Sequence, residues 1–143
     1  MNDDIQDNIE DNEEPDGLTD EELQAHISYL NEVMDDYERF INNIGKNGIT
    51  AKLMLNYRDE IQEILSFLNN YEIDLSKYWT RLVKLDQILR SRRTAAVKEI
   101  GRKNFIMEQI RKEPPKDHWW WYIDRSVPKD KPGFWDFMKK PEW

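Results

Sequence analysis

The sequence predicts an all-α protein, and three observations carry that prediction. Neither glycine nor proline occurs from Ile49 to Ile100, although turns usually need one of them. Apolar residues recur at alternating spacings of three and four, the pattern of helices that pack against one another. Charged residues make up 35% of the chain, which favours an elongated helical protein over a compact α/β one. We expect an antiparallel helical hairpin extended to a three-helix bundle with coiled-coil-like heptad seams, a long third helix and an irregular, aromatic-rich tail.

The chain begins with an acidic arm. Residues 1–17 contain eight acidic residues and no basic residue. Because like charges repel and apolar residues are sparse, we expect this arm to be disordered. It does not resemble a signal peptide, and the longest apolar run is far below the ~20 residues that span a bilayer. We therefore expect a soluble, cytoplasmic protein.

The first helix is expected over residues 19–44. Thr19 and Glu22 have the spacing of a capping box, in which the threonine oxygen accepts an amide hydrogen bond and the glutamate reaches back. Behind them, apolar residues repeat at spacings of four and three over three heptads: Leu23, Ile27, Leu30, Met34, Tyr37, Ile41 and Ile44. Gly45 ends the helix, and the following Lys-Asn-Gly sequence is typical of a turn.

The second helix is expected over residues 49–70, antiparallel to the first. Its seam consists of Met54, Tyr57, Ile61, Ile64, Leu68 and Tyr71. Leu53, Leu65 and Phe67 widen the apolar face, which suggests contact with two helices rather than one.

The junction after this helix allows two interpretations. Asn69 and Asn70 are typical of a turn, and Asp74 or Ser76 could cap a new helix. The seam nevertheless continues in phase through the junction. The alternative is therefore a two-helix hairpin in which one continuous helix of about 60 residues dimerises with a second copy.

The third helix is expected over residues 74–112, within a helical region that spans 18–112. Leu75, Tyr78, Leu82, Leu85 and Leu89 continue the seam, which then weakens at Arg92. Gly101 could kink this helix, and Pro114 with Pro115 stops it. Because this helix is longer than the other two, we expect its second half to project beyond them.

Residues 113–143 form a tail rich in proline and tryptophan. Tryptophan, tyrosine and arginine anchor many protein interfaces, so we predict that the tail docks onto a protein partner. The predicted partner-binding residues are Trp119, Trp120, Trp121, Tyr122, Phe134 and Trp135. The alternative is that the tail folds back onto its own helices.

The charges fall into blocks. Residues 18–74 contain 12 acidic and 4 basic residues, whereas residues 75–112 contain 3 acidic and 11 basic residues. One interpretation is that the acidic helices pair with the basic helix. The other is that basic side chains beside the third seam bind phosphates. The possible anion-binding residues are Lys77, Arg81, Lys84, Arg92, Arg102 and Lys103.

The sequence contains no motif that indicates catalysis. It has no cysteine and two histidines, no glycine-rich phosphate loop and no Glu-x-x-His pair of a dimetal bundle. We therefore predict a non-enzymatic interaction protein without cofactor or metal, acting as an adaptor, an assembly factor or a small subunit. The alternatives are nucleic-acid or anionic-surface binding regulated by the acidic arm, and peripheral membrane attachment through the tail. A homo-oligomer is compatible with each of these.

Overall fold

The structure of the protein is a computed structural model that describes residues 17–46 and 51–129. Every regular element in these residues is helical, so the all-α prediction is confirmed. Three predictions concern residues outside this description. They are the disorder of the acidic arm, the turn at residues 47–48 and the final part of the tail.

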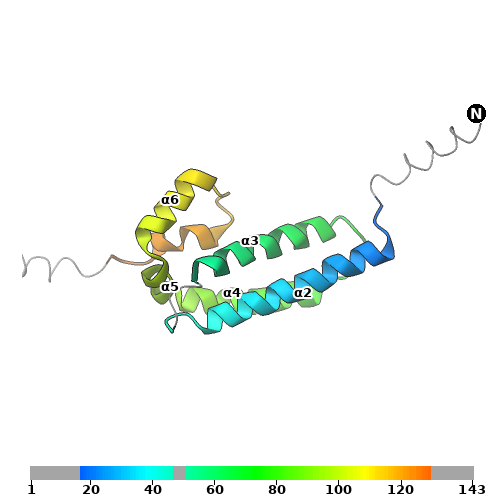
Figure 1. Cartoon of the computed structure of the whole chain (residues 1–143), viewed down its shortest axis with the longest axis horizontal. Helices are drawn as coiled ribbons and strands as arrows, with labels where there is room; N and C mark the ends of the chain where they lie inside the picture. Colours follow the sequence, from blue (N-terminus) through cyan, green and yellow to red (C-terminus); the bar gives the residue numbers. More distant parts are fainter. Residues whose placement is uncertain (1–16, 47–50, 130–143) are drawn as a thin grey trace, which may run out of the picture.

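Three long helices lie alongside one another, and the shorter helices gather at one end of them (Figure 1). The helices are α2 (Asp20–Asn42), α3 (Ala51–Leu68), α4 (Ser76–Ser91), α5 (Arg93–Ile100), α6 (Arg102–Lys112) and the 3₁₀ helix η1 (Trp119–Ser126). The chain reverses after α2, so that α3 runs back alongside it, and it reverses again before α4. The helices α5, α6 and η1 then fold together beside the start of α3 (Figure 1).

The predicted capping box begins α2. The Thr19 hydroxyl accepts a hydrogen bond from the amide of Glu22 at 3.0 Å, and the Thr19 amide donates to the Glu22 carboxylate at 2.9 Å. The helix ends at Asn42. Gly45 follows with a φ of 90°, a backbone conformation that residues other than glycine rarely adopt. Local sequence chemistry therefore sets both ends of α2.

The chain leaves the helical conformation between Leu68 and Ser76, so the alternative of one continuous helix is wrong. Asp74 stabilises the new start, because its carboxylate accepts a hydrogen bond from the Ser76 amide at 3.0 Å. Hydrogen bonds from the side chain and the amide of Ser76 lower the pKa of the Asp74 carboxyl. The connection contains seven residues, the length of one heptad. The apolar spacing therefore stays in phase although the helix is interrupted.

The prediction of one long third helix over residues 74–112 is also wrong, because the region contains three helices. The first break is at Arg92, whose guanidinium donates to the carbonyl of Ile41 at the end of α2 at 2.9 Å. The second is at Gly101, which has a φ of 94°. The helix α5 packs against α3, α4 and η1 instead of projecting beyond them.

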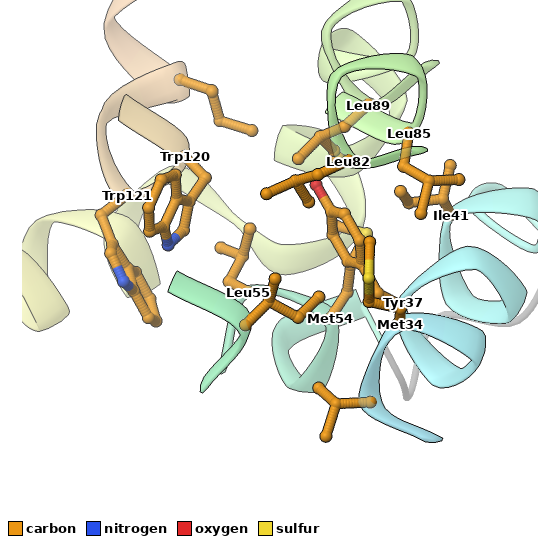
Figure 2. Close-up of a cluster of buried hydrophobic side chains, with 14 of the residues drawn as sticks. Met34, Tyr37, Ile41, Met54, Leu55, Leu82, Leu85, Leu89, Trp120 and Trp121 are labelled. Atoms are coloured by element: carbon orange, nitrogen blue, oxygen red, sulfur yellow. The ribbon is translucent and has the colours of Figure 1, made fainter. Parts of the chain in front are cut away.

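One cluster of buried apolar side chains runs through all these helices. Figure 2 shows its central part, where Met34 and Tyr37 of α2 meet residues of α3 and α4. Trp120 and Trp121 lie at one side of this cluster, next to Leu55 (Figure 2). The described part of the aromatic tail is therefore built into the core.

Candidate functional site

The tryptophan run is folded back onto α3. Trp120 and Trp121 are each only 1% exposed, and Trp119 and Tyr122 are partly buried against the same cluster. The tail was predicted to be irregular, but its residues Trp119–Ser126 form the 3₁₀ helix η1. In this arrangement Trp120 and Trp121 have no surface to present to a partner. Phe134 and Trp135 lie outside the described residues.

A buried charged network attaches Trp120 to the three long helices. The Arg58 guanidinium on α3 makes two hydrogen bonds of 3.0 Å to the Asp86 carboxylate on α4. The Tyr37 hydroxyl on α2 donates to the same carboxylate at 2.7 Å. The guanidinium also lies 4.0 Å from the centre of the Trp120 ring. Arg58 and Asp86 are 4% and 6% exposed, so each requires the other for its charge to be tolerated.

The pKa of Tyr37 is raised well above its ordinary value. Burial is the largest cause, because it disfavours the charged phenolate, and the negative charge of Asp86 adds to it. The tyrosine is therefore a neutral hydrogen-bond donor throughout the physiological pH range.

The neighbouring residue of α3, Asp59, binds both buried indoles. Its carboxylate accepts hydrogen bonds of 2.8 Å from the indole nitrogens of Trp120 and Trp121. The imidazole of His118 stacks on Trp120 with 4.7 Å between ring centres, and its Nδ1 lies 3.9 Å from the Asp59 carboxylate. Arg58 and Asp59, which are consecutive residues of α3, thus both contact the tail.

The helix α6 is fixed to η1 along one face. The Gln109 amide donates to the Trp121 carbonyl at 2.9 Å and to the Asp124 carboxylate at 3.0 Å. The Arg102 guanidinium donates to the Asp124 and Val127 carbonyls. Phe105 of the same helix is 1% exposed and belongs to the buried apolar cluster. This face of α6 therefore has a defined orientation relative to the rest of the protein.

The other face of α6 is apolar and open to solvent. Ile106, Met107 and Ile110 are 49%, 54% and 72% exposed, and we call these three residues the α6 stripe. Residues three and four apart are neighbours on a helix, so the three side chains form one patch. Exposed apolar residues are unremarkable singly, but a contiguous group on an anchored helix is a candidate docking surface.

The six predicted anion-binding residues do not form one site, although Lys77, Arg81 and Lys84 follow one face of α4 at spacings of four and three. Arg81 binds the carboxylates of Asp35 and Glu38 at 2.7 Å, a contact of the kind expected from the charge blocks. Arg92 and Arg102 donate to backbone carbonyls, as described above. The ammonium of Lys77 lies 5.1 Å from the ring centre of its neighbour Tyr78. Lys84 and Lys103 are exposed on different helices.

Arg58, Asp59 and Asp86 did not stand out in the sequence. A signal was present, because Arg58 lies between Met54 and Ile61 at spacings of four and three. Asp86 lies in the same way between the buried leucines of α4. Opposite charges at apolar seam positions of two helices indicate a buried ion pair. The spacing alone does not show that Arg58 and Asp86 contact each other.

The parts of the chain that the structure describes contain no cluster of three or more potential metal ligands. Among the described helices, none is long and apolar enough to cross a membrane. Comparison with protein-family models, with curated proteins and with solved structures gives no match.

Proposed function

We propose that this protein is a non-enzymatic interaction module that docks onto a partner protein through the α6 stripe. The observation that carries the proposal is the exposure of three large apolar side chains on one face of a helix whose other face is fixed. An adaptor, an assembly factor or a small subunit of a complex would use such a surface, and we propose that it acts in the cytoplasm.

Docking through α6 suits recognition in which a helix is laid into a groove. In that mode, apolar side chains at spacings of three and four enter one apolar channel of the partner. Ile106 and Ile110 have the spacing of four, and Met107 and Ile110 have the spacing of three. Because η1 already holds α6 in a helix, binding does not require the helix to form.

The charges beside the stripe define the partner further. Lys103 and Arg111 are exposed on α6. Glu108, the one acidic residue of this helix, is 6% exposed and accepts a 2.6 Å hydrogen bond from Arg111. The exposed charges within α6 itself are thus positive, and the exposed carboxylate of Glu113 follows at its C-terminal cap. We propose that the partner presents an apolar groove with an acidic rim.

The aromatic residues first predicted as anchors have a different part in this proposal. Trp120 and Trp121 position α6 from inside the protein, whereas Phe134 and Trp135, which lie outside the described residues, stay proposed partner-binding residues. Membrane attachment and nucleic-acid binding have less support. Trp120 and Trp121 are buried, and three of the six predicted basic residues already bind carboxylates or backbone carbonyls.

The test compares two double variants in the full chain. Ile106→Ser with Ile110→Ser removes the stripe, whereas Leu53→Ser with Val83→Ser removes apolar residues of 46% and 53% exposure elsewhere. After the partner is identified by cross-linking and purified, calorimetry measures its affinity for each variant. Burying one isoleucine contributes roughly 1.5–3 kcal/mol, so the stripe variant should bind at least about a hundredfold more weakly. The control variant should bind like the wild type.

A zero-length carbodiimide cross-link tests the acidic rim. Lys103 should couple to an aspartate or glutamate of the partner, and the stripe variant should lose this product. Three results would contradict the proposal. They are equal losses in both double variants, a stripe that instead mediates association of two copies in sedimentation, and a stripe that is needed for vesicle flotation.

A further inference from the structure

A second surface lies on the other side of η1, in a hollow of about 410 Å³ between this segment, the end of α4 and the start of α5. Its walls combine cationic and aromatic side chains. The lining residues are Arg90, Arg93, Lys116, Trp119, Tyr122, Ile123, Arg125 and Ser126. Ile106, Met107 and Ile110 are not among them, so the hollow is distinct from the docking surface proposed above.

The charge of the hollow is uncompensated. Arg90, Arg93, Lys116 and Arg125 line it, and no carboxylate does. Among the described residues, none of these four cations takes part in an ion pair, in contrast to Arg58 on α3. All four are exposed, so their charge faces solvent. A concave surface with one sign of charge attracts ligands of the opposite sign.

Two of the guanidinium groups are oriented by aromatic rings. The guanidinium of Arg90 lies 3.9 Å from the ring centre of Trp119, and that of Arg125 lies 4.7 Å from the ring centre of Tyr122. Arg93 is tied to the same place, because it donates to the Arg90 carbonyl at 2.8 Å. A guanidinium over a ring keeps its N–H donors in its own plane, where they can bind an oxyanion at two points.

The rings themselves have little freedom. Trp119 packs edge-on against the buried Trp120, with 5.7 Å between ring centres. The Tyr122 hydroxyl donates to the Pro114 carbonyl. The arginine side chains therefore rest on a rigid surface, and a ligand would need to order little when it binds.

We propose that this hollow binds the phosphate dianion of a small, soluble phosphate monoester. Paired planar guanidinium groups match phosphate geometry, and phosphate carries almost two negative charges at pH 7. The volume is in the lower range of small-molecule sites, and the edges of Trp119, Tyr122 and Ile123 leave an apolar wall for the organic group. The proposal rests on these residues alone and stands or falls independently of the α6 stripe.

The experiment titrates the full chain with phenyl phosphate, inorganic phosphate and phenyl sulfate by calorimetry. Phenyl phosphate should bind about tenfold more tightly than the singly charged sulfate ester, and its affinity should fall below about pH 6 as the second phosphate proton is bound. Tighter binding of phenyl phosphate than of inorganic phosphate assigns the site to an ester. Equal binding assigns it to free phosphate, and both results support a phosphate site.

Substitutions then locate the site. Arg90→Gln and Arg93→Gln should each weaken phenyl phosphate binding about tenfold. Arg93→Gln leaves the Arg90–Trp119 and Arg125–Tyr122 contacts in place. A loss of phenyl phosphate affinity in this variant therefore does not result from a displaced Trp119. Lys84→Gln removes the same charge from another face of α4 and should change affinity by less than about twofold.

Nuclear magnetic resonance gives a local readout. Phenyl phosphate should shift the indole N–H signal of Trp119, while the indole signals of Trp120 and Trp121, bound to Asp59, stay in place. The proposal is overturned if Lys84→Gln weakens binding as much as Arg90→Gln, if the sulfate ester binds equally well, or if a single-stranded oligonucleotide alone binds and all variants weaken it equally.

Discussion

Along α2, α3 and α4 the contacts are mostly between aliphatic side chains, whereas η1 and α6 are joined to the protein through charged residues and aromatic rings. Leu30, Leu65 and Leu89 are typical of the first region, and each is fully buried. The second region depends on charged residues of α3, because the Arg58 guanidinium contacts Trp120 and the Asp59 carboxylate binds both buried indoles. Apolar packing tolerates exchange of similar side chains, but a buried charge requires its particular partner. The first region should therefore tolerate substitution better than the second.

The largest effect should come from removing the segment that contains η1. A chain that ends at Glu113 loses Trp120 and Trp121 and uncovers the start of α3. Loss of one buried tryptophan side chain costs about 3–5 kcal/mol, so we expect the whole segment to contribute more than about 5 kcal/mol to the free energy of unfolding. Urea denaturation followed by circular dichroism measures this. A chain that ends at Lys129 is the control, because it keeps every described contact.

A shortened chain that unfolds like the control would show that the long helices are stable alone. Such independence is what the sequence suggested, since the tail was expected to dock elsewhere. The result would also separate the two regions into independent folding units.

The next effect concerns the buried ion pair. Asp86→Ala leaves the Arg58 guanidinium buried without a counter-charge, and we expect a loss of about 3–5 kcal/mol in urea denaturation. Replacing both residues, with Arg58→Met and Asp86→Leu, should cost less than this single change. If the double variant is instead less stable than Asp86→Ala, the ion pair stabilises the folded protein beyond neutralising two buried charges.

A smaller effect is expected at Asp59. The change Asp59→Ala removes the acceptor of two buried indole N–H groups, which should cost about 1–3 kcal/mol. The indole proton signals of Trp120 and Trp121 should move upfield in the same variant. Asp35→Ala is the matched control, because it removes a carboxylate from the exposed contact with Arg81, which is worth less than about 1 kcal/mol. Equal losses would mean that Asp59 acts only through its charge.

The smallest effect at neutral pH should come from Tyr37→Phe, which removes one hydrogen bond worth about 1 kcal/mol. The effect of this substitution on the free energy of unfolding should depend on pH. The pKa of Tyr37 is raised in the folded protein, so the unfolded chain loses this proton first as the pH rises above about 10. The wild type should therefore be destabilised progressively above that pH, and Tyr37→Phe should reduce the slope.

Tyr29 is the control for this pH dependence. A hydrogen bond to Glu60 is the main reason that the pKa of Tyr29 is raised to about 12, so it titrates in the same direction. Because Tyr29 is half exposed, solvent screens its contribution, and Tyr29→Phe should change the slope less. An unchanged slope in Tyr37→Phe would contradict the assignment.

Much of the first region could be predicted from the sequence, because its apolar residues carry the period of a helix. All but the first two members of the predicted seam of α2 are buried, and the capping box is where the spacing places it. Periodicity was less reliable on α3. Leu55 is fully buried but was not in the predicted seam, whereas Leu53 and Phe67 are exposed. A wide apolar face predicts burial of some residues but does not say which.

The second region could not be predicted, because distant residues determine it. The helix break at Arg92 depends on a carbonyl of α2, and the position of Trp120 depends on Arg58 and Asp59. Arg90 and Arg93 are not among the predicted anion-binding residues. Their convergence with Lys116 and Arg125 requires the reversal of the chain after Pro114, which no local pattern specifies.

The connection between α3 and α4 has one further consequence. Because residues 69–75 are not helical, α4 turns back onto the α2 of its own chain. The Arg81 guanidinium of α4 thereby reaches the Asp35 and Glu38 carboxylates of α2. Part of the charge of the acidic and basic blocks is thus neutralised within one molecule.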